Sequence, residues 1–237
     1  MSLNTFTFGG IASDSYNVYG QGAGMFNKPK RRVESIAIPG KSGNLVIEQN
    51  AWENVDITYH CILPQTFEDD FNEFVAALHT KQGYQTLTES LSPGYFRMAV
   101  FSEAISPKIT RQYKGGSFIV RFSAQPQRYL NSGQESTTLT ASGTITNPTE
   151  YPSKPLLKVY GAGNLGIGGM TITIASPGYS YIYIDCEAMD AYYGATPLNN
   201  KITLSSNDFP VLAPGTNNIS LGSGITRVEI TPRWWTI

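Results

Sequence analysis

One stretch of the sequence imitates a nucleotide-binding loop. A phosphate-binding loop has the pattern G-x-x-x-x-G-K-[ST] and opens a helix, whose backbone N–H groups converge on the phosphates. Residues 35–42 read S-I-A-I-P-G-K-S, so Ser35 stands where the first glycine is required. A glycine and an asparagine follow, and they make a poor helix start. Because Pro39 fixes φ, and because Gly40 and Gly43 permit positive φ, the stretch predicts the tight turn of a β-hairpin.

A second stretch imitates a dinucleotide-binding loop. Residues 161–166 read G-A-G-N-L-G, which fits G-x-G-x-x-G, and Asp185 lies about twenty residues further on, where such a fold wants an acid. The fingerprint also needs a helix immediately after it. Residues 167–174 read I-G-G-M-T-I-T-I, whose β-branched alternation is typical of a strand. A glycine-rich hairpin is therefore favoured over a cofactor loop, and we expect no cofactor.

The acidic residues and histidines form no recognisable active site. Asp185, Glu187 and Asp190 lie close in sequence, but a calcium loop needs denser oxygen ligands and nothing else supports a glycosidase pair. A solvated strand end is favoured for them. His60 and His79 are the only histidines, and neither has a partner at metal-ligand spacing. No catalytic triad can be nominated, so we expect no catalytic residue, no metal site and no enzymatic activity.

A short basic cluster could form a binding surface instead. It consists of Lys28, Lys30, Arg31 and Arg32. A few charges give only weak, salt-sensitive attraction to phosphate, so a solvated loop is favoured over a phosphate contact.

Tyrosines form the second candidate surface. The group comprises Tyr179, Tyr181, Tyr183, Tyr192 and Tyr193. Strand alternation places Tyr181 and Tyr183 on one sheet face, with Ile182 and Ile184 on the other. Such a face could stack on sugars, pack beneath a loop or contact a partner chain, and packing or an interface is favoured over sugar. The four basic residues, Tyr181 and Tyr183 are therefore our interface candidates.

The composition describes a polar, weakly charged protein. Charged residues make up 15% of the 237, and the net charge is −1, so the chain offers no broad basic surface for nucleic acid. Cys61 and Cys186 are the only cysteines, which predicts no disulfide framework and synthesis in a reducing compartment. The first residues lack the basic start and apolar segment of a signal peptide. No apolar run approaches the roughly 20 residues of a bilayer-spanning helix, so we expect no membrane insertion.

Apolar spacing predicts one helix and many strands. An apolar stripe with a 3.6-residue period predicts a helix over residues 67–82, closed by Gly83. The stripe consists of Phe67, Phe71, Phe74, Val75 and Leu78. Elsewhere apolar and polar residues alternate, as in residues 57–63 and 118–124, and the second strand of the predicted hairpin is expected over residues 52–63. The pattern predicts a mainly β protein of antiparallel sandwiches.

A composition change predicts two domains. Residues 131–150 are rich in Ser, Thr and Gly, and prolines follow. We expect an N-terminal β-sandwich domain with the helix over residues 1–130, a linker over residues 131–154, and a C-terminal β-sandwich domain over residues 155–237.

The order and spacing of these segments resemble the distal tail protein (Dit) family, the tail-tip hub of long-tailed, non-contractile phages. The resemblance extends over the whole length, although no single motif in it is specific. Its segments include the opening strand at residues 6–9, the I-P-G-K-S-G turn, the helix, F-S-A-Q-P-Q-R-Y at 122–129, Y-I-Y-I-D-C-E at 181–187 and R-W at 233–234.

The resemblance implies a non-enzymatic structural hub of a phage or prophage tail tip. The N-terminal domain would close into a homo-hexameric ring, single or stacked in a pair, and the C-terminal domain would be similar to galectins or carbohydrate-binding modules. The ring would join the major tail tube protein to the tail-associated tip protein or fibre, with receptor-binding proteins as further partners and DNA only as passing cargo. The implied location is the virion tail tip, after synthesis and assembly in the cytoplasm of the bacterial host.

A function of a different class stays open. The chain could be a glycan-binding module, similar to a lectin, with the tyrosine-rich face of the C-terminal domain as its site.

Overall fold

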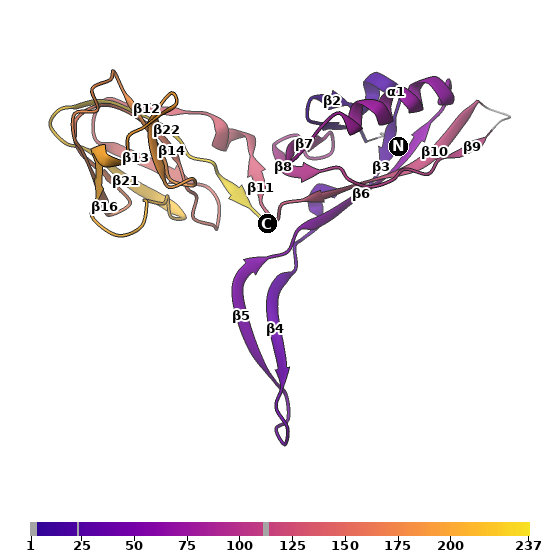
Figure 1. The fold of residues 1–237 in the computed structure, drawn as a ribbon, viewed down its shortest axis with the longest axis horizontal. Helices are drawn as coiled ribbons and strands as arrows, with labels where there is room; N and C mark the ends of the chain where they lie inside the picture. The colour runs from indigo at the N-terminus through magenta and orange to yellow at the C-terminus, as the bar shows by residue number, and fades with distance from the viewer. Residues whose placement is uncertain (1–3, 23, 111–113) are drawn as a thin grey trace. The chain divides into compact units, whose positions relative to one another are not determined.

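The computed structural model describes residues 4–22, 24–110 and 114–237, and the chain divides into two compact units (Figure 1). The first unit ends at Arg128 and also holds Ile237, and the second is Tyr129–Thr236. Strands dominate both units, and the described residues contain one α-helix. The prediction of a mainly β protein with a single helix is confirmed.

The first unit is built around a sheet with the strand order β2-β1-β7-β8-β10-β6-β3, and β9 pairs with the start of β10. Its strands are β1 (Phe6–Phe8), β2 (Ile11–Ala12), β3 (Tyr19–Gln21), β6 (Val55–Leu63), β7 (Gln85–Glu89), β8 (Tyr95–Val100), β9 (Lys108–Thr110) and β10 (Gly115–Ala124). Strands β6 and β10 form a long antiparallel ladder, and their alternating apolar residues point into the core as predicted. Two short 3-10 helices, Ser13–Tyr16 and Gly24–Phe26, lie between the early strands.

Helix α1 (Phe67–His79) buries its apolar stripe against this sheet. The ring of Phe74 is fully buried, with its centroid 6.2 Å from that of Phe6 and 6.1 Å from that of Phe118. The helix ends three residues before the predicted end. The hydroxyl of Thr80 donates to the carbonyl of Ala77 at 2.6 Å, a local bond of the kind that competes with helix continuation.

A two-stranded ribbon extends away from the rest of the first unit (Figure 1). It consists of β4 (Arg31–Ala37), β5 (Asn44–Trp52) and the turn between them, and we call it the arm. In the turn, Gly40 and Gly43 have φ of 77° and 83°, which confirms the predicted hairpin turn. The second strand of the hairpin was predicted wrongly over residues 52–63, most of which form β6 of the main sheet. Residues 44–52 were not predicted as a strand because both faces of the ribbon are exposed to solvent. Their sequence therefore shows no clean alternation of apolar and polar residues.

The second unit is a sandwich of two antiparallel sheets. One sheet has the strand order β12-β22-β14-β17-β18-β19, and the other has the order β13-β21-β15-β16-β20. The first comprises β12 (Thr137–Leu139), β14 (Leu156–Gly161), β17 (Ile182–Asp185), β18 (Asp190–Tyr193), β19 (Thr196–Pro197) and β22 (Ile225–Thr231). The second comprises β13 (Gly143–Asn147), β15 (Gly163–Ile167), β16 (Met170–Ile174), β20 (Ile202–Leu204) and β21 (Gly215–Leu221). Inward-facing aliphatic residues of both sheets form one core, which also buries Trp234.

Two segments of the second unit bear on the expectations from sequence. Residues 131–154, expected as a linker, contain β12 and β13, which are edge strands of the two sheets. Their threonines are β-branched and suit a strand, although the Ser/Thr/Gly content is also typical of a linker. The G-x-G-x-x-G segment leads into β15 and then into β16, so a strand follows it instead of a helix, as predicted. The remaining short elements are β11 (Arg128–Leu130), β23 (Trp235–Thr236) and the 3-10 helices Asn131–Gln134 and Asn199–Lys201.

Candidate interaction surfaces

The described residues contain no cluster of three or more His, Cys, Asp and Glu side chains that could hold a metal ion. Within the same parts of the chain, no helix combines the length and the apolar character needed to cross a bilayer. His79 packs its ring edge-on against Phe101, with centroids 5.0 Å apart. His60 lies on the opposite face of the sheet from the core, where it lines a pocket.

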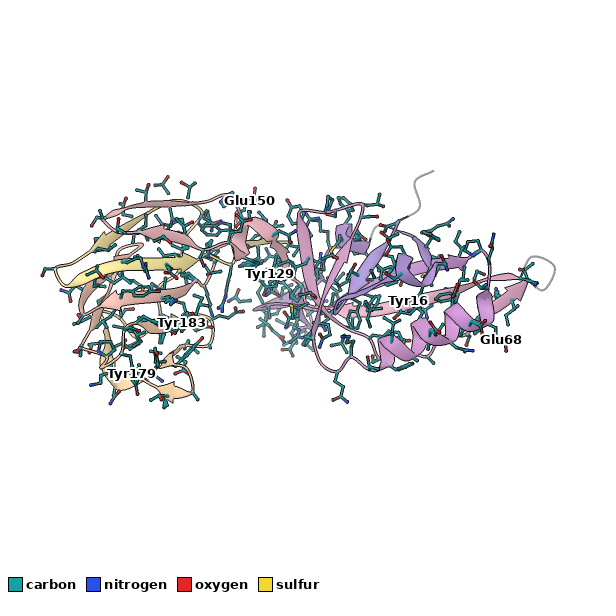
Figure 2. The ribbon with its side chains drawn as sticks, turned by 90° about the horizontal axis from the view of Figure 1, so that it is seen from above. Tyr16, Glu68, Tyr129, Glu150, Tyr179 and Tyr183 are labelled. Carbon is teal, nitrogen blue, oxygen red and sulfur yellow. The ribbon has the colours of Figure 1, made fainter. Side chains whose placement is uncertain are left out.

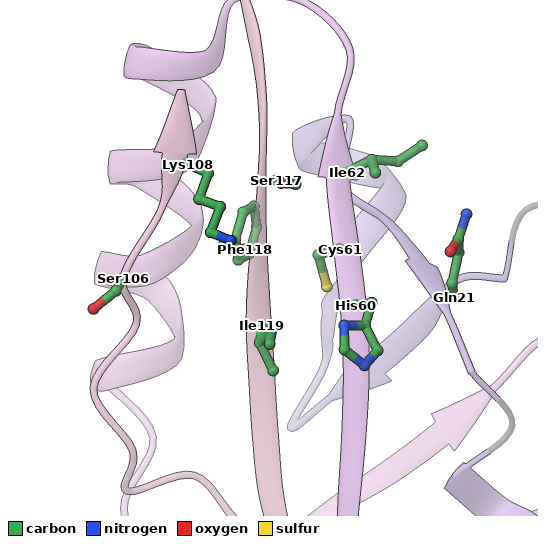
Figure 3. Close-up of a pocket in the computed structure, with 9 residues that line it drawn as sticks. All are labelled: Gln21, His60, Cys61, Ile62, Ser106, Lys108, Ser117, Phe118 and Ile119. Atoms are coloured by element: carbon green, nitrogen blue, oxygen red, sulfur yellow. The ribbon is translucent and has the colours of Figure 1, made fainter. Parts of the chain in front are cut away.

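That pocket, of about 290 Å³, lies over β3, β6 and β10 in the first unit (Figure 3). His60 is directly opposite Ile119 on the neighbouring strand, and Lys108 borders the pocket from β9. The lining contains no carboxylate, so His60 has no acid beside it to form a catalytic pair. The lining of the pocket mixes polar and apolar side chains.

The arm presents apolar side chains to solvent on both of its faces. Every residue of β4 is exposed, and so are the first seven residues of β5. Val46 is 56% exposed on the face that it shares with Val33 and Ser35. Ile36, Leu45 and Ile47 are exposed on the other face. Exposed aliphatic residues gathered on one projecting element mark an interaction surface, whereas scattered single ones do not.

The basic cluster does not form a free cationic patch. The Lys28 ammonium donates to the terminal carbonyl oxygen of Ile237 at 2.5 Å. Burial, together with the positive charges of Arg128 and Arg97, lowers the pKa of Lys28. Further along, Lys30 lies 3.8 Å from the carboxylate of Glu53, and Arg31 lies 3.1 Å from that of Glu48 and over the ring of Trp52. Of the four candidate residues, Arg32 is the one whose side chain has no hydrogen-bond or ion-pair partner among the described residues.

A buried polar network fixes the chain segment before the arm. Arg97 is fully buried on β8, and its guanidinium donates to the carbonyls of Asn27, Gln125 and Pro126 at 2.8, 3.2 and 2.7 Å. Burial lowers the pKa of Arg97 to about 10, and the positive charge of Arg128 contributes to the shift. Arg97 was not predicted as a functional residue, since nothing in the pattern of β8 marks an inward-facing arginine.

Glu89 holds the same segment from the other side. Its carboxylate accepts the backbone N–H of Met25 at 3.1 Å and the hydroxyl of Tyr59 at 2.9 Å. Burial, with the charge of Glu89 as the next cause, raises the pKa of Tyr59, so its hydroxyl stays protonated and donates. Arg128 adds a hydrogen bond to the Met25 carbonyl at 3.3 Å and lies 4.0 Å over the ring of Tyr95. The network therefore anchors the root of the arm in the core of the first unit.

Of the three carboxylates predicted at a solvated strand end, Asp185 and Glu187 pair with Arg233, whereas Asp190 accepts a hydrogen bond from Asn199. Arg233 binds Asp185 through two hydrogen bonds of 2.7 and 2.9 Å and reaches Glu187 at 3.3 Å. Burial alone would raise the pKa of Asp185, but the hydrogen bonds from Arg233 and from the backbone N–H groups of residues 187 and 188 outweigh it and lower the pKa. The pair is structural, because it ties the segment before β23 to the end of β17.

Tyrosines of the second unit gather at the outer face of the six-stranded sheet. Tyr179 and Tyr183 are labelled in Figure 2. We call this surface the tyrosine face, and it consists of Tyr160, Tyr179, Tyr181, Tyr183, Tyr192 and Tyr193. Tyr193 is partly buried against the core of the unit, and its ring stacks on that of Tyr179. Tyr183 is opposite Lys158 on one neighbouring strand and opposite Tyr192 on the other. The prediction that Tyr181 and Tyr183 share a face opposite Ile182 and Ile184 is confirmed, since both isoleucines are fully buried.

Charged side chains are interleaved with these rings. Lys158 lies 4.4 Å over the ring of Tyr181, and Arg227 lies 3.8 Å over the ring of Tyr160. Glu229 accepts the Tyr160 hydroxyl at 3.0 Å and pairs with Arg227 at 3.2 Å and with Lys158 at 3.6 Å. Lys158, Arg227 and Glu229 were not predicted as part of this surface. Lys158 is two positions from Tyr160, and this spacing in a strand indicates a shared face.

Comparison with protein families finds no matching family model, and no curated protein matches in sequence. Solved structures do match. The Dit protein (gp 19.1) of phage SPP1, described as a paradigm of the hub adsorption apparatus in phages that infect Gram-positive bacteria, aligns over 100% of both chains with a TM-score of 0.67 and 12% identity. The chain has the fold of the SPP1 hub protein.

Two further matches are structures of the phage P2 baseplate in its activated conformation, one with Ca and one with Sr. They cover 97% of this chain and 98% of theirs at 9% identity, with TM-scores of 0.49 and 0.47. The Dit-like fold includes both units and the arm, because the SPP1 alignment leaves no part of either chain uncovered.

Proposed function

We propose that the protein is a non-enzymatic structural hub of a siphophage tail tip. In this role the first unit assembles into a hexameric ring, the ring joins the tail tube to the tip fibre or adhesion device, and DNA passes through the central hole. The observation that carries the proposal is the full-length likeness in fold to the SPP1 hub protein.

The arm supports an assembling role. A ring requires a heterologous interface, in which one patch of a subunit meets a different patch of the next. The arm is a projecting element with exposed aliphatic residues on both faces, and the network of Arg97 and Glu89 fixes its root. Burying Val46, Ile47 and their neighbours on an adjacent subunit would remove this apolar surface from water. Each subunit contact in a stable ring should bury at least about 1,000 Å².

The charge distribution is compatible with DNA as passing cargo. A channel with a strongly basic lining would hold phosphates and impede their sliding. Lys28, Lys30 and Arg31 are engaged with carbonyl or carboxylate groups of their own chain, and the net charge of the chain is −1. The chain therefore has little unpaired positive charge at its one basic cluster.

Light scattering after size exclusion tests the ring. The full chain should give a mass near six or twelve times its 25.9 kDa, and negative-stain images should show rings with a central hole. The double variant Val46→Asp/Ile47→Asp should give folded monomers. It places a charge on each face of the arm, and neither residue belongs to a hydrophobic core. The control Thr144→Asp, at an exposed position of β13 in the second unit, should assemble as the wild type does.

Two results would contradict the proposal. One is a wild-type chain that stays monomeric at high concentration, and the other is an arm variant that assembles as well as the wild type.

A further inference from the structure

We propose that the tyrosine face is a binding site for a neutral, hydroxyl-rich oligosaccharide chain. The inference goes beyond the structural role proposed above and does not depend on ring formation. It is carried by the free hydroxyl groups of the face, by its internal charge balance and by the contrast with the outer face of the other sheet of the same unit.

The hydroxyl groups of the face have unused hydrogen-bonding capacity. Tyr160 donates to Glu229, whereas the described residues offer no hydrogen-bond partner to the hydroxyls of the other five tyrosines. These five rings are half-buried or exposed, with Tyr179 at 43% exposure. Each phenol can donate one hydrogen bond and accept others, which matches the alternating donors and acceptors of sugar hydroxyls. Tyr193 also packs against the core, whereas Tyr179, Tyr181, Tyr183 and Tyr192 keep accessible ring surface.

The rings also offer apolar surface in an extended row. Tyr179 stacks on Tyr193 at 4.3 Å, Tyr181 lies 4.8 Å from Tyr193, and Tyr183 lies 5.4 Å from Tyr192. Mutual stacking fixes the ring orientations, so little conformational entropy is lost when a ligand is bound. The row from Glu229 through Lys158 and Tyr183 to Tyr192 crosses four adjacent strands, a span of about 14 Å at the usual strand spacing. A span of this length accommodates several sugar rings.

Charge balance on the face points to a neutral ligand. Lys158 and Arg227 both pair with Glu229, and Arg233 pairs with Asp185 and Glu187 at the end of β17, so the positive and negative groups in these pairs are equal in number. Neither an anionic nor a cationic ligand would find excess opposite charge here. A sugar can accept hydrogen bonds from Lys158 and donate them to Glu229 while water remains around both groups.

The same charges argue against a protein partner. The core of a protein interface is depleted of charged residues, and burying an ion pair costs desolvation energy that the pair does not always recover. On the tyrosine face Lys158 lies directly beside Tyr183, and Glu229 lies beside Lys158 on the next strand. A dry protein contact over this row would have to bury them.

The outer face of the five-stranded sheet supplies an internal contrast. Its outward residues are small and polar, and neither charges nor aromatic rings occur in these five strands. Asn218, Thr171 and Thr203 are representative. A hydroxyl-rich ligand that needs aromatic surface would therefore distinguish the two faces of the same unit, and Asn218 provides a matched control position.

A glycan array with the full-length protein tests the proposal. The array carries neutral oligosaccharides of hexoses, N-acetylhexosamines and deoxyhexoses beside anionic glycans, and hits are measured by titration with the free oligosaccharide. We expect binding to at least one neutral oligosaccharide. Tyr181→Ala and Tyr183→Ala should each weaken it at least about tenfold, since each removes a ring contact. Tyr183→Phe should cause a smaller loss, and Asn218→Ala should bind as the wild type does.

Four results would overturn the proposal. These are the absence of any neutral hit, binding restricted to anionic glycans and lost in salt, a hit that Asn218→Ala weakens as much as the tyrosine variants, and tyrosine variants that alter the assembled mass but not glycan binding. Thermal melting checks that each variant is folded. All these positions lie on outer sheet faces, so we expect melting temperatures close to that of the wild type.

Discussion

Replacing Arg97 by an apolar residue of similar volume should strongly destabilise the first unit. Arg97 is fully buried and donates to three carbonyls at 3.2 Å or less, one of which belongs to Asn27 at the root of the arm. In Arg97→Met the aliphatic volume is largely kept, but the buried carbonyl oxygens lose their charged donor. The substitution also removes the positive charge that helps to balance the carboxylate of Glu89. Glu89 stays buried and keeps its two hydrogen bonds.

The expected cost follows from these contacts. A hydrogen bond to a charged group contributes about 1.5–3 kcal/mol, and three such bonds are lost. Part of this loss is offset, because the mutant no longer has to bury a guanidinium, a cost that appears as the lowered pKa of Arg97. Breaking one side of a buried charged network typically destabilises by about 3–5 kcal/mol, and we expect Arg97→Met to fall in that range.

The assay must report on the first unit alone. The three tryptophans are Trp52 in the arm and Trp234 and Trp235 in the C-terminal segment, so their fluorescence is a poor probe of this core. Amide hydrogen exchange of β6 and β8, followed across a guanidinium titration, gives the change in free energy of unfolding of this unit. Exchange in the segment before the arm should accelerate as well, because its carbonyl anchors are gone.

Arg121→Met is the matched control. Arg121 lies on the exposed face of β10 and makes no hydrogen bond or ion pair with the described residues, so its replacement should change stability by less than about 0.5 kcal/mol. A loss of under about 1 kcal/mol in Arg97→Met would refute the reasoning, since it would mean that the carbonyls find other donors at no cost.

Three further predictions concern both units. Because the folded-state pKa of Asp185 is lowered, its pairing with Arg233 should add stability above the unfolded pKa of about 3.9. That stability should disappear as the pH falls through the folded value, and Arg233→Ala should flatten this acid limb in pH-dependent melting. Phe74→Ala should destabilise the first unit by about 3–5 kcal/mol in denaturant unfolding, against little change for the exposed control Glu73→Ala on the same helix. Burial raises the pKa of both cysteine thiols to about 12, so neither should react with a thiol reagent at pH 8 unless denaturant is present; rapid labelling of the native protein would contradict their burial.

The local patterns of the sequence determined most of the elements. Alternation with period two placed the inward residues of β6, β10 and β17, and a 3.6-residue period placed α1. The two motifs that imitate nucleotide sites were predicted to be hairpin or strand segments, because the residues after each lack helix character, and the structure confirms this. These inferences succeeded because side-chain direction in a strand or helix depends on neighbours a few positions away.

The tertiary structure decided which segments pair and what each polar residue meets. The partner of β4 is β5 rather than the strand after it, and the supposed linker supplies edge strands to two sheets. Arg97 meets carbonyls from residues 70 positions before it and 28 after it, and Asp185 meets Arg233 across 48 positions. Such contacts depend on how the strands are ordered in the sheets, which local spacing does not encode. The sequence therefore specified the faces of the elements, and packing decided which face became a core, an anchor or an open surface.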